Sequence, residues 1–149
     1  MGELLPNTLD DDELAAYFAL RDAGSRLQRA VTKHLHGHGL TEVQFSILAR
    51  LGGSEEGVAM TELARDLVIT KSGLTYQAGQ LEIRGLVSRQ SSPGDERSIL
   101  VHLTAQGAAV LSETLPSHVA LVRELFIDRM PRQDLMIVRD ALARVARDG

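Results

Sequence analysis

The sequence of 149 residues lacks cysteine and tryptophan and has only three phenylalanines and two tyrosines. Without cysteine, disulfide bonds and thiol-based redox sensing are excluded. Long apolar runs are also missing, since none approaches the roughly 20 residues of a membrane-spanning helix. The acidic N-terminal segment MGELLPNTLDDDE lacks the basic start and apolar core of a signal peptide. We therefore expect a cytoplasmic protein with no membrane partner, folded as one domain over residues 1–149.

Residues 61–85 predict two short helices joined by a tight turn. Thr61 is placed to cap a first helix that ends at Leu67, and Thr70 is placed to cap the second. Gly85 is expected in the left-handed conformation that ends the second helix. The apolar residues of that helix recur at spacings of four and three, so they form one buried face: Leu74, Ala78 and Leu81.

The opposite face of the second helix carries residues that are small or form hydrogen bonds and are not needed for burial. Such residues near a helix N-terminus suit contact with base edges in the major groove of duplex DNA. An ordinary solvated helix face is the alternative interpretation. The residues of this face and of the front end of the helix are Lys71, Ser72, Gly73, Thr75, Tyr76, Gly79 and Gln80.

A hairpin is predicted after the second helix. Residues 86–90 and 98–103 read as strands, the connecting loop SSPGDER contains proline and glycine, and residues 58–60 are expected to add a short third strand. Arg97 suits insertion into the minor groove, where negative potential is concentrated, and Asp95 is placed to orient its side chain by a charge-assisted hydrogen bond. A surface ion pair of little energetic consequence is the alternative. The whole order predicts a winged helix-turn-helix lobe over residues 58–103 that binds double-stranded DNA.

The charge of the chain is distributed unevenly. The net charge is −4, and residues 1–57 hold nine acidic and five basic residues, whereas residues 58–103 hold five of each. The excess of acid therefore lies outside the predicted lobe. Because the lobe itself is only neutral, we expect weak non-specific affinity for DNA and recognition that depends on shape and geometry.

A long helix is predicted before the lobe, over residues 10–36. It begins near the acidic cluster Asp10 to Asp12 and ends at Gly37. Thr41 and Gln44 then form a capping box for the following helix. The apolar residues of the long helix form a stripe, which is expected to pack partly within the chain and partly against a second copy.

Further helices are predicted after the lobe, over residues 105–147. Thr104 is placed to cap a long helix that Pro116 should kink, and Pro131 is placed as the first residue of the last helix. The apolar faces are wider than one neighbour would cover, so residues 10–36 and 105–147 predict a helical dimerisation region and a homodimer. The expected fold class is mainly α with a small β-hairpin wing, in which N- and C-terminal dimerisation helices flank the winged helix-turn-helix.

The five histidines are the remaining candidates for chemistry. His34 and His38 have the i, i+4 spacing that can chelate a metal on a helix, and a polar helix end is the alternative interpretation. His102 and His118 are interpreted as surface residues. The sequence offers neither a local pairing of a nucleophile with a base nor a glycine-rich phosphate loop. We therefore expect no enzymatic activity and no cofactor.

Three sequence motifs together resemble the MarR family of bacterial transcriptional regulators. They are LEIRGLV at residues 81–87, GDERS at residues 94–98, and the set Leu103, Thr104 and Gly107. The resemblance covers roughly residues 12–147. It implies a homodimeric repressor on a pseudo-palindromic operator, whose wing arginine enters the minor groove and whose second helix enters the major groove. The resulting DNA-binding candidates are Lys71, Ser72, Gly73, Thr75, Tyr76, Gln80, Arg84, Arg89, Asp95 and Arg97.

The same resemblance implies a small anionic or aromatic effector. The residues that would line its site are Tyr17, Phe18 and Phe45, although apolar residues at these positions also suit a protein core. Two other functions stay open at this point. One is a metal-responsive regulator that uses His34 and His38, and the other is a winged-helix module that contacts proteins and does not bind DNA.

Overall fold

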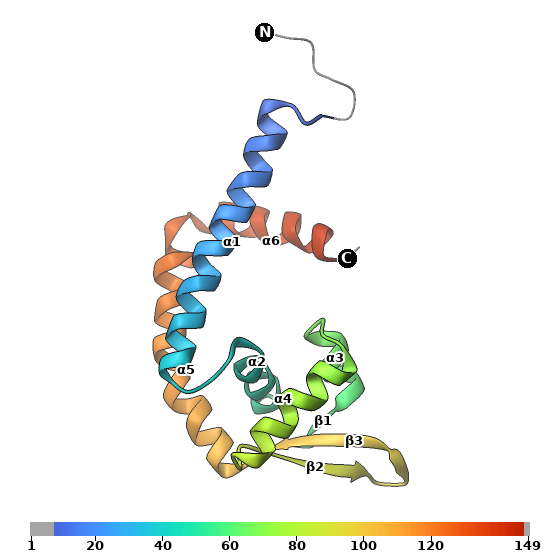
Figure 1. The fold of residues 1–149 in the computed structure, drawn as a ribbon. Coiled ribbons are helices and arrows are strands. Elements are labelled where there is room, and N and C mark those ends of the chain that lie inside the picture. Colours follow the sequence, from blue (N-terminus) through green and yellow to red (C-terminus); the bar gives the residue numbers. More distant parts are fainter. Residues whose placement is uncertain (1–7, 148–149) are drawn as a thin grey trace. The chain divides into compact units, whose positions relative to one another are not determined.

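The computed structural model describes residues 8–147, except for the side chain of Glu96. This part of the chain is mainly helical with one small three-stranded sheet (Figure 1), which confirms the predicted fold class. The elements in chain order are α1 (Asp11–Gly37), α2 (Glu42–Gly52), β1 (Val58–Ala59), α3 (Met60–Asp66), α4 (Lys71–Ile83), β2 (Val87–Ser92), β3 (Asp95–Leu103), α5 (Ala105–Leu125), the 3-10 helix η1 (Ile127–Arg129) and α6 (Arg132–Arg147).

The chain divides into two compact units. One comprises residues 32–120 and contains the whole of the segment 58–103. The other is formed by the two ends of the chain, up to residue 31 and from residue 121 onward. Helices α1 and α5 each contribute residues to both units. Among the described residues, no helix combines the length and the apolar character that crossing a membrane requires.

The first two helices begin at capping boxes. The Glu13 backbone N–H donates to Asp10 Oδ1 (2.8 Å), and the Asp10 N–H donates to Glu13 Oε1 (2.9 Å). At α2, the Gln44 N–H donates to Thr41 Oγ1, and the Thr41 N–H donates to Gln44 Oε1, each over 3.1 Å. Each box satisfies two backbone donors that a helix start would otherwise leave unpaired. Both predicted helix starts are confirmed.

The start of α3 differs from the prediction. The residue before its first turn is Ala59, which makes no side-chain cap, and Thr61 already lies inside the helix. The reason is tertiary, because Ala59 pairs with Leu100 in the sheet and the strand passes directly into the helix. The prediction that Thr61 caps this helix is therefore wrong.

The turn after α3 contains a backbone conformation that is unfavourable for its residue. Val68 has a φ of +53°, and its side chain is 88% exposed. Its N–H donates to the Arg65 carbonyl (3.3 Å), while the Ile69 N–H donates to the Ala64 carbonyl (3.1 Å). These two bonds end α3, but β-branched side chains disfavour left-handed backbone. The turn of the helix-turn-helix is therefore strained at Val68.

Helix α4 has the boundaries that its sequence signals predict. The Gly73 N–H donates to Thr70 Oγ1 (3.0 Å), which caps the start. At the end, Gly85 has a φ of +77°, and the Leu86 N–H donates to the Leu81 carbonyl (3.0 Å). This is the bonding pattern of a Schellman cap. The predicted inner face is also confirmed, since the buried residues of this helix are Leu74, Ala78 and Leu81.

The three strands form an antiparallel sheet in the order β1-β3-β2. Val87 pairs with Leu103 at one end of the hairpin, and Ser92 pairs with Asp95 near its tip, after a register shift between Ser91 and Ser92. The hairpin is longer than predicted because pairing continues into the SSPGDER segment. The third strand is confirmed at residues 58–59, whereas Met60 belongs to α3.

The core lies in the 32–120 unit. It is built from the end of α1, from α2, α3 and α4, from the sheet and from the first part of α5. The largest fully buried side chains are Leu35, Ile47, Leu48, Leu51, Leu63, Leu74, Leu81, Val87, Val101 and Thr114. This core fixes the positions of α4 and the wing relative to each other.

The C-terminal helices start close to where the sequence predicts. Thr104 Oγ1 accepts the Gly107 N–H (3.0 Å) and donates to the Gly85 carbonyl (2.6 Å), so one hydroxyl caps α5 and ties it to the end of α4. Pro116 lies inside α5. Pro131 precedes α6 by one residue and is not its first residue, and its carbonyl accepts the Leu135 N–H (3.1 Å).

Candidate nucleic-acid interface

The outward face of α4 carries the side chains that the sequence assigns to DNA contact. Lys71, Ser72, Thr75 and Tyr76 are exposed, and the Tyr76 side chain is 64% exposed although it is aromatic. Gly73 and Gln80 are half-buried. Thr75 Oγ1 donates to the Lys71 carbonyl (2.8 Å), which holds the threonine rotamer and leaves its oxygen free to accept. A polar, accessible surface therefore lies over the first turns of α4.

The wing presents Arg97 next to this surface. Its side chain is exposed, and Asp95 Oδ1 accepts a hydrogen bond from the Arg97 backbone N–H (3.0 Å). We predicted that Asp95 orients the side chain of Arg97. The structure differs, because the Asp95 carboxylate accepts from the backbone of Arg97 and not from its guanidinium. Among the described side chains, no carboxylate lies within ion-pair distance of the Arg97 guanidinium.

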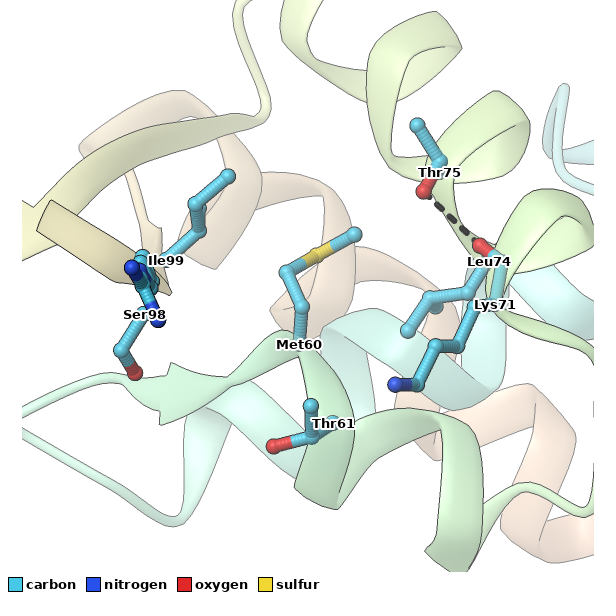
Figure 2. A pocket seen from close by; sticks show the side chains of 8 residues that line it. Met60, Thr61, Lys71, Leu74, Thr75, Ser98 and Ile99 are labelled. Atoms are coloured by element: carbon cyan, nitrogen blue, oxygen red, sulfur yellow. Dashed lines mark hydrogen bonds between the residues drawn. The ribbon is translucent and has the colours of Figure 1, made fainter.

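A small cavity of about 140 Å³ joins α4 to the wing. Figure 2 shows Lys71 and Thr75 of α4 and Ser98 and Ile99 of β3 around the same space. Arg97 also lines it. The remaining lining residues are Met60, Thr61 and Leu74. The fold thus brings two cations to one location, although they come from different elements.

Two other predicted DNA-binding arginines have partners within the chain. Arg84 Nη1 donates to the Gly39 carbonyl (2.8 Å). Arg89 donates to Glu82 through Nε (3.2 Å), Nη2 (3.0 Å) and its backbone N–H (3.0 Å). These bonds to the arginine hold the pKa of the Glu82 carboxyl below its ordinary value, with burial opposing. Both arginines therefore fix α4 to its surroundings in this structure.

Comparison with known proteins agrees with this geometry. A model of the MarR family matches residues 38–98. AbsC, a MarR family transcriptional regulator from Streptomyces coelicolor, has a crystal structure similar to this chain, with a TM-score of 0.91 and 31% identity over 95% of this chain and 97% of AbsC. The chain belongs to the MarR family.

Two further proteins similar to this MarR-family chain are described by a partner or a role, one by its complex with DNA and the other as a repressor. Sco3205, another MarR family transcriptional regulator from Streptomyces coelicolor, was solved in complex with DNA, and its TM-score is 0.90 at 29% identity over 97% of this chain and 91% of Sco3205. The transcriptional repressor YetL of Bacillus subtilis is 28% identical over 142 residues, which cover 93% of this chain and 85% of YetL.

Sequence reasoning missed one residue that positions α4 in this MarR-family chain. Gln44 Nε2 donates to Gln77 Oε1 (3.1 Å), which links α2 to α4. Gln44 is buried, and its oxygen already serves the capping box. The only signal in the sequence was that a capping-box glutamine keeps an NH₂ group that needs an acceptor.

Three histidines of this MarR-family chain come together, and we call His38, His34 and His118 the histidine row. The ring centroids of His38 and His34 lie 4.8 Å apart, and those of His34 and His118 lie 5.9 Å apart. His118 continues to Phe45, with centroids 4.4 Å apart, and His34 Nε2 is hydrogen bonded to Ser117 Oγ (2.7 Å).

The positions of the histidines bear on two predictions, the surface location of His102 and His118 and the metal site at His34 and His38. His118 and His102 are half-buried, so their interpretation as surface residues is wrong. The error arose because the partners of His118 on α1 and α2 are distant in sequence. Within residues 8–147, no group of three or more histidine, aspartate or glutamate side chains is placed to hold a metal ion. Among these described side chains, none is therefore placed as a third ligand beside His34 and His38.

The predicted effector residues belong to different units. Phe45 is buried in the 32–120 unit beside His118. Tyr17 and Phe18 belong to the terminal unit, where they are 47% and 52% exposed and their rings lie 5.7 Å apart. Tyr17 also accepts a hydrogen bond from Arg21 Nη1 (3.1 Å).

Proposed function

We propose that this MarR-family chain is a transcriptional regulator that binds double-stranded DNA. In this proposal α4 lies in the major groove and the β2–β3 hairpin reaches the minor groove. The observation that carries it is the meeting of Lys71 and Arg97, both exposed, at the cavity between α4 and the wing. The similar structure of Sco3205, solved with DNA, supports the same function.

The exposed side chains divide into two kinds of contact in this proposal. Lys71 and Arg97 neutralise phosphates or enter the minor groove, because they are cations with no carboxylate partner among the described side chains. Ser72, Thr75, Tyr76 and Gln80 reach base edges, and Gly73 permits close approach of the backbone. Arg84, Arg89 and Asp95 act indirectly, since their hydrogen bonds hold α4 and the wing in position.

We further propose that the protein acts as a homodimeric repressor. The terminal unit supports the dimer, because α6 buries none of its residues in the single chain and a cavity of about 370 Å³ opens along its apolar side. Two-fold symmetry then requires half-sites about 10 base pairs apart, so that both copies of α4 enter the same side of the duplex. YetL, described as a repressor, supports the direction of regulation.

A salt titration of binding to a selected duplex tests the proposed function. If Lys71 and Arg97 make the phosphate contacts, a dimer offers four, and log affinity falls with log salt by a slope of about −3.6. If Arg84 and Arg89 leave their partners to bind phosphate, the slope steepens to about −7. A protein that selects no duplex from a random pool, or that shows no salt dependence, would instead be a protein-interaction module.

A further inference from the structure

The histidine row is connected to α4 through α2. Phe45 lies against His118, and the adjacent residue Gln44 donates to Gln77 on α4 over 3.1 Å. Phe45 and Gln44 are both buried, at 8% exposure each. One packed ring and one part-buried hydrogen bond therefore connect His118 to α4.

A second connection starts at the other end of the row. His38 is followed by Gly39, which has a φ of +75° and whose carbonyl accepts the Arg84 guanidinium over 2.8 Å. Arg84 is the residue at which α4 ends. The two ends of the histidine row thus meet α4 at two separate places, one at its middle and one at its C-terminus.

The environment of His34 and His118 favours their neutral imidazoles. Burial, followed by the proximity of His38, lowers the pKa of His34. Burial, followed by the proximity of His34, lowers the pKa of His118, and Glu42 on α2 opposes this shift. The Nδ1 atoms of His34 and His118 are buried and have no hydrogen-bond partner among the described residues.

The other charged groups at the row cannot neutralise two imidazolium ions at His34 and His118. Glu42 supplies one carboxylate, from α2. Arg84, from α4, brings a further positive charge to the carbonyl of Gly39. Imidazolium ions at His34 and His118, whose ring centroids lie 5.9 Å apart, would repel one another and would require water at their buried Nδ1 atoms.

We propose that the histidine row is a proton-operated switch that controls the position of the recognition helix α4. With neutral imidazoles, the row packs against Phe45 and holds the arrangement of α4 that binds DNA. Protonation separates the rings, moves the start of α2, and weakens the Gln44–Gln77 and Arg84–Gly39 bonds. The inference rests on the proposed DNA-binding function.

The sign of this effect distinguishes it from general electrostatics. Acidification makes any protein more positive and so strengthens its attraction to phosphate. The switch lowers DNA affinity on acidification, because the histidines bind protons better in the arrangement of α4 that does not fit DNA. A proton, like any ligand, shifts the equilibrium only by its differential affinity for the two arrangements, and each unit of pKa difference corresponds to about tenfold in DNA affinity.

The test uses the full-length protein, a chelator in all samples, and a duplex selected from a random pool at about pH 7.5, the range in which an ordinary histidine is neutral. Between about pH 7.5 and pH 5.5 at constant ionic strength, wild-type affinity should fall about tenfold. The double variant His34→Gln/His118→Gln should lose most of this fall. The matched control His36→Gln changes an exposed histidine of the same helix and should retain it.

Two further results decide the proposal. Glu42→Gln removes the carboxylate that favours protonation of His118, so it should shift the midpoint of the affinity loss to lower pH. The proposal is overturned if wild-type affinity rises or stays constant on acidification. It is also overturned if the double glutamine variant, shown to be folded by circular dichroism, loses affinity as the wild type does.

A readout without DNA separates this proposal from the proposed function. In the free protein, nuclear magnetic resonance can follow the imidazole signals of the row together with the side-chain NH₂ signal of Gln44. The proposal requires the Gln44 signal to shift with the same midpoint as His118. If no duplex binds at any pH, the proposed DNA-binding function is wrong. If the Gln44 signal does not change while His118 titrates, the proposed switch is wrong.

Discussion

The two units of this chain use their apolar residues in opposite ways. In the 32–120 unit, leucines from α2, α3 and α4 are completely buried, as Leu48, Leu63 and Leu81 illustrate with 0% exposure each. In the terminal unit, Ile137 and Val145 of α6 are 61% and 67% exposed. The first unit therefore contains its own core. The second presents an apolar surface that a single chain does not cover.

This difference assigns separate tasks to the two units. A surface that must match the grooves of DNA needs elements fixed by a packed core, because small displacements remove directional hydrogen bonds. A helical surface that awaits a second copy must stay apolar and accessible until it binds. The 32–120 unit, which we propose to bind DNA, is complete in one chain, and the proposed dimer would complete the other.

The largest predicted effect is on the core of the 32–120 unit. Leu48→Ala, at a position with 0% exposure, should lower the free energy of unfolding by about 2–5 kcal/mol, because it leaves a cavity that neighbours fill only partly. Urea unfolding monitored by circular dichroism measures this loss. Leu142→Ala, at 39% exposure on α6, is the matched control and should cost less at protein concentrations where the chain is monomeric. Equal losses would abolish the distinction between the units.

The next effect concerns the exposed face of the terminal unit. Ile137→Glu should shift the protein from dimer to monomer in sedimentation equilibrium, because it places a charge on an apolar surface that the proposed dimer buries. The wild type should also unfold at higher temperature as its concentration rises, and the variant should not. A wild-type protein that sediments as a well-folded monomer at micromolar concentration would show that the apolar face of α6 serves some other partner.

A smaller effect is expected at the strained turn before α4. Val68→Gly removes a β-branched side chain from a backbone with a φ of +53°, and glycine adopts this conformation without steric cost. Since the side chain is 88% exposed, little packing is lost, and stability should rise by about 1 kcal/mol. Thermal unfolding measures the gain, for which Val58→Gly in β1 is a control that should destabilise. If Val68→Gly also destabilises, this valine makes a contact that the single chain does not reveal.

The smallest effect is the dependence of stability on pH. The pKa values of His34 and His118 are lowered in the folded chain, so the unfolded chain takes up these protons at higher pH than the folded one. Stability from this source is therefore fully present above about pH 6.5 and falls as the pH drops below it, until the folded-state pKa values are passed. Urea midpoints for the wild type and for His34→Gln/His118→Gln should converge at acidic pH. A constant difference across this range would contradict the pKa shifts.

Local signals in the sequence predicted much of the fold. Thr41, Thr70 and Thr104 each cap a helix through a bond to a residue three positions later, and Gly85 ends α4 in the left-handed conformation. Such features depend on a few adjacent residues, so a pattern of residue types is enough to identify them.

The features that sequence reasoning missed depend on residues far apart in the chain. Arg84 binds a carbonyl 45 residues away, and His34 binds Ser117 across 83 residues. Thr61 met the local rule for a cap but is displaced from that role by the pairing of Ala59 with Leu100. Composition and spacing hold no information about which distant residues meet, and so the partners of Arg84 and the histidine row were not predictable.

The unequal length of the strands has a consequence for solubility. Strand β1 pairs only with Val101 and Leu100 of β3 in the described structure, so Ile99 and Asp95 of β3 pair with β2 alone. Residues 96–98 lie between them at the register shift and pair with neither strand. An open strand edge is a template for a strand of another molecule, and charged side chains on it discourage such pairing. Asp95 and Arg97 lie on this edge. These two residues, which we propose to act in DNA binding by the wing, would thus also disfavour edge-to-edge aggregation of the protein when no DNA is bound.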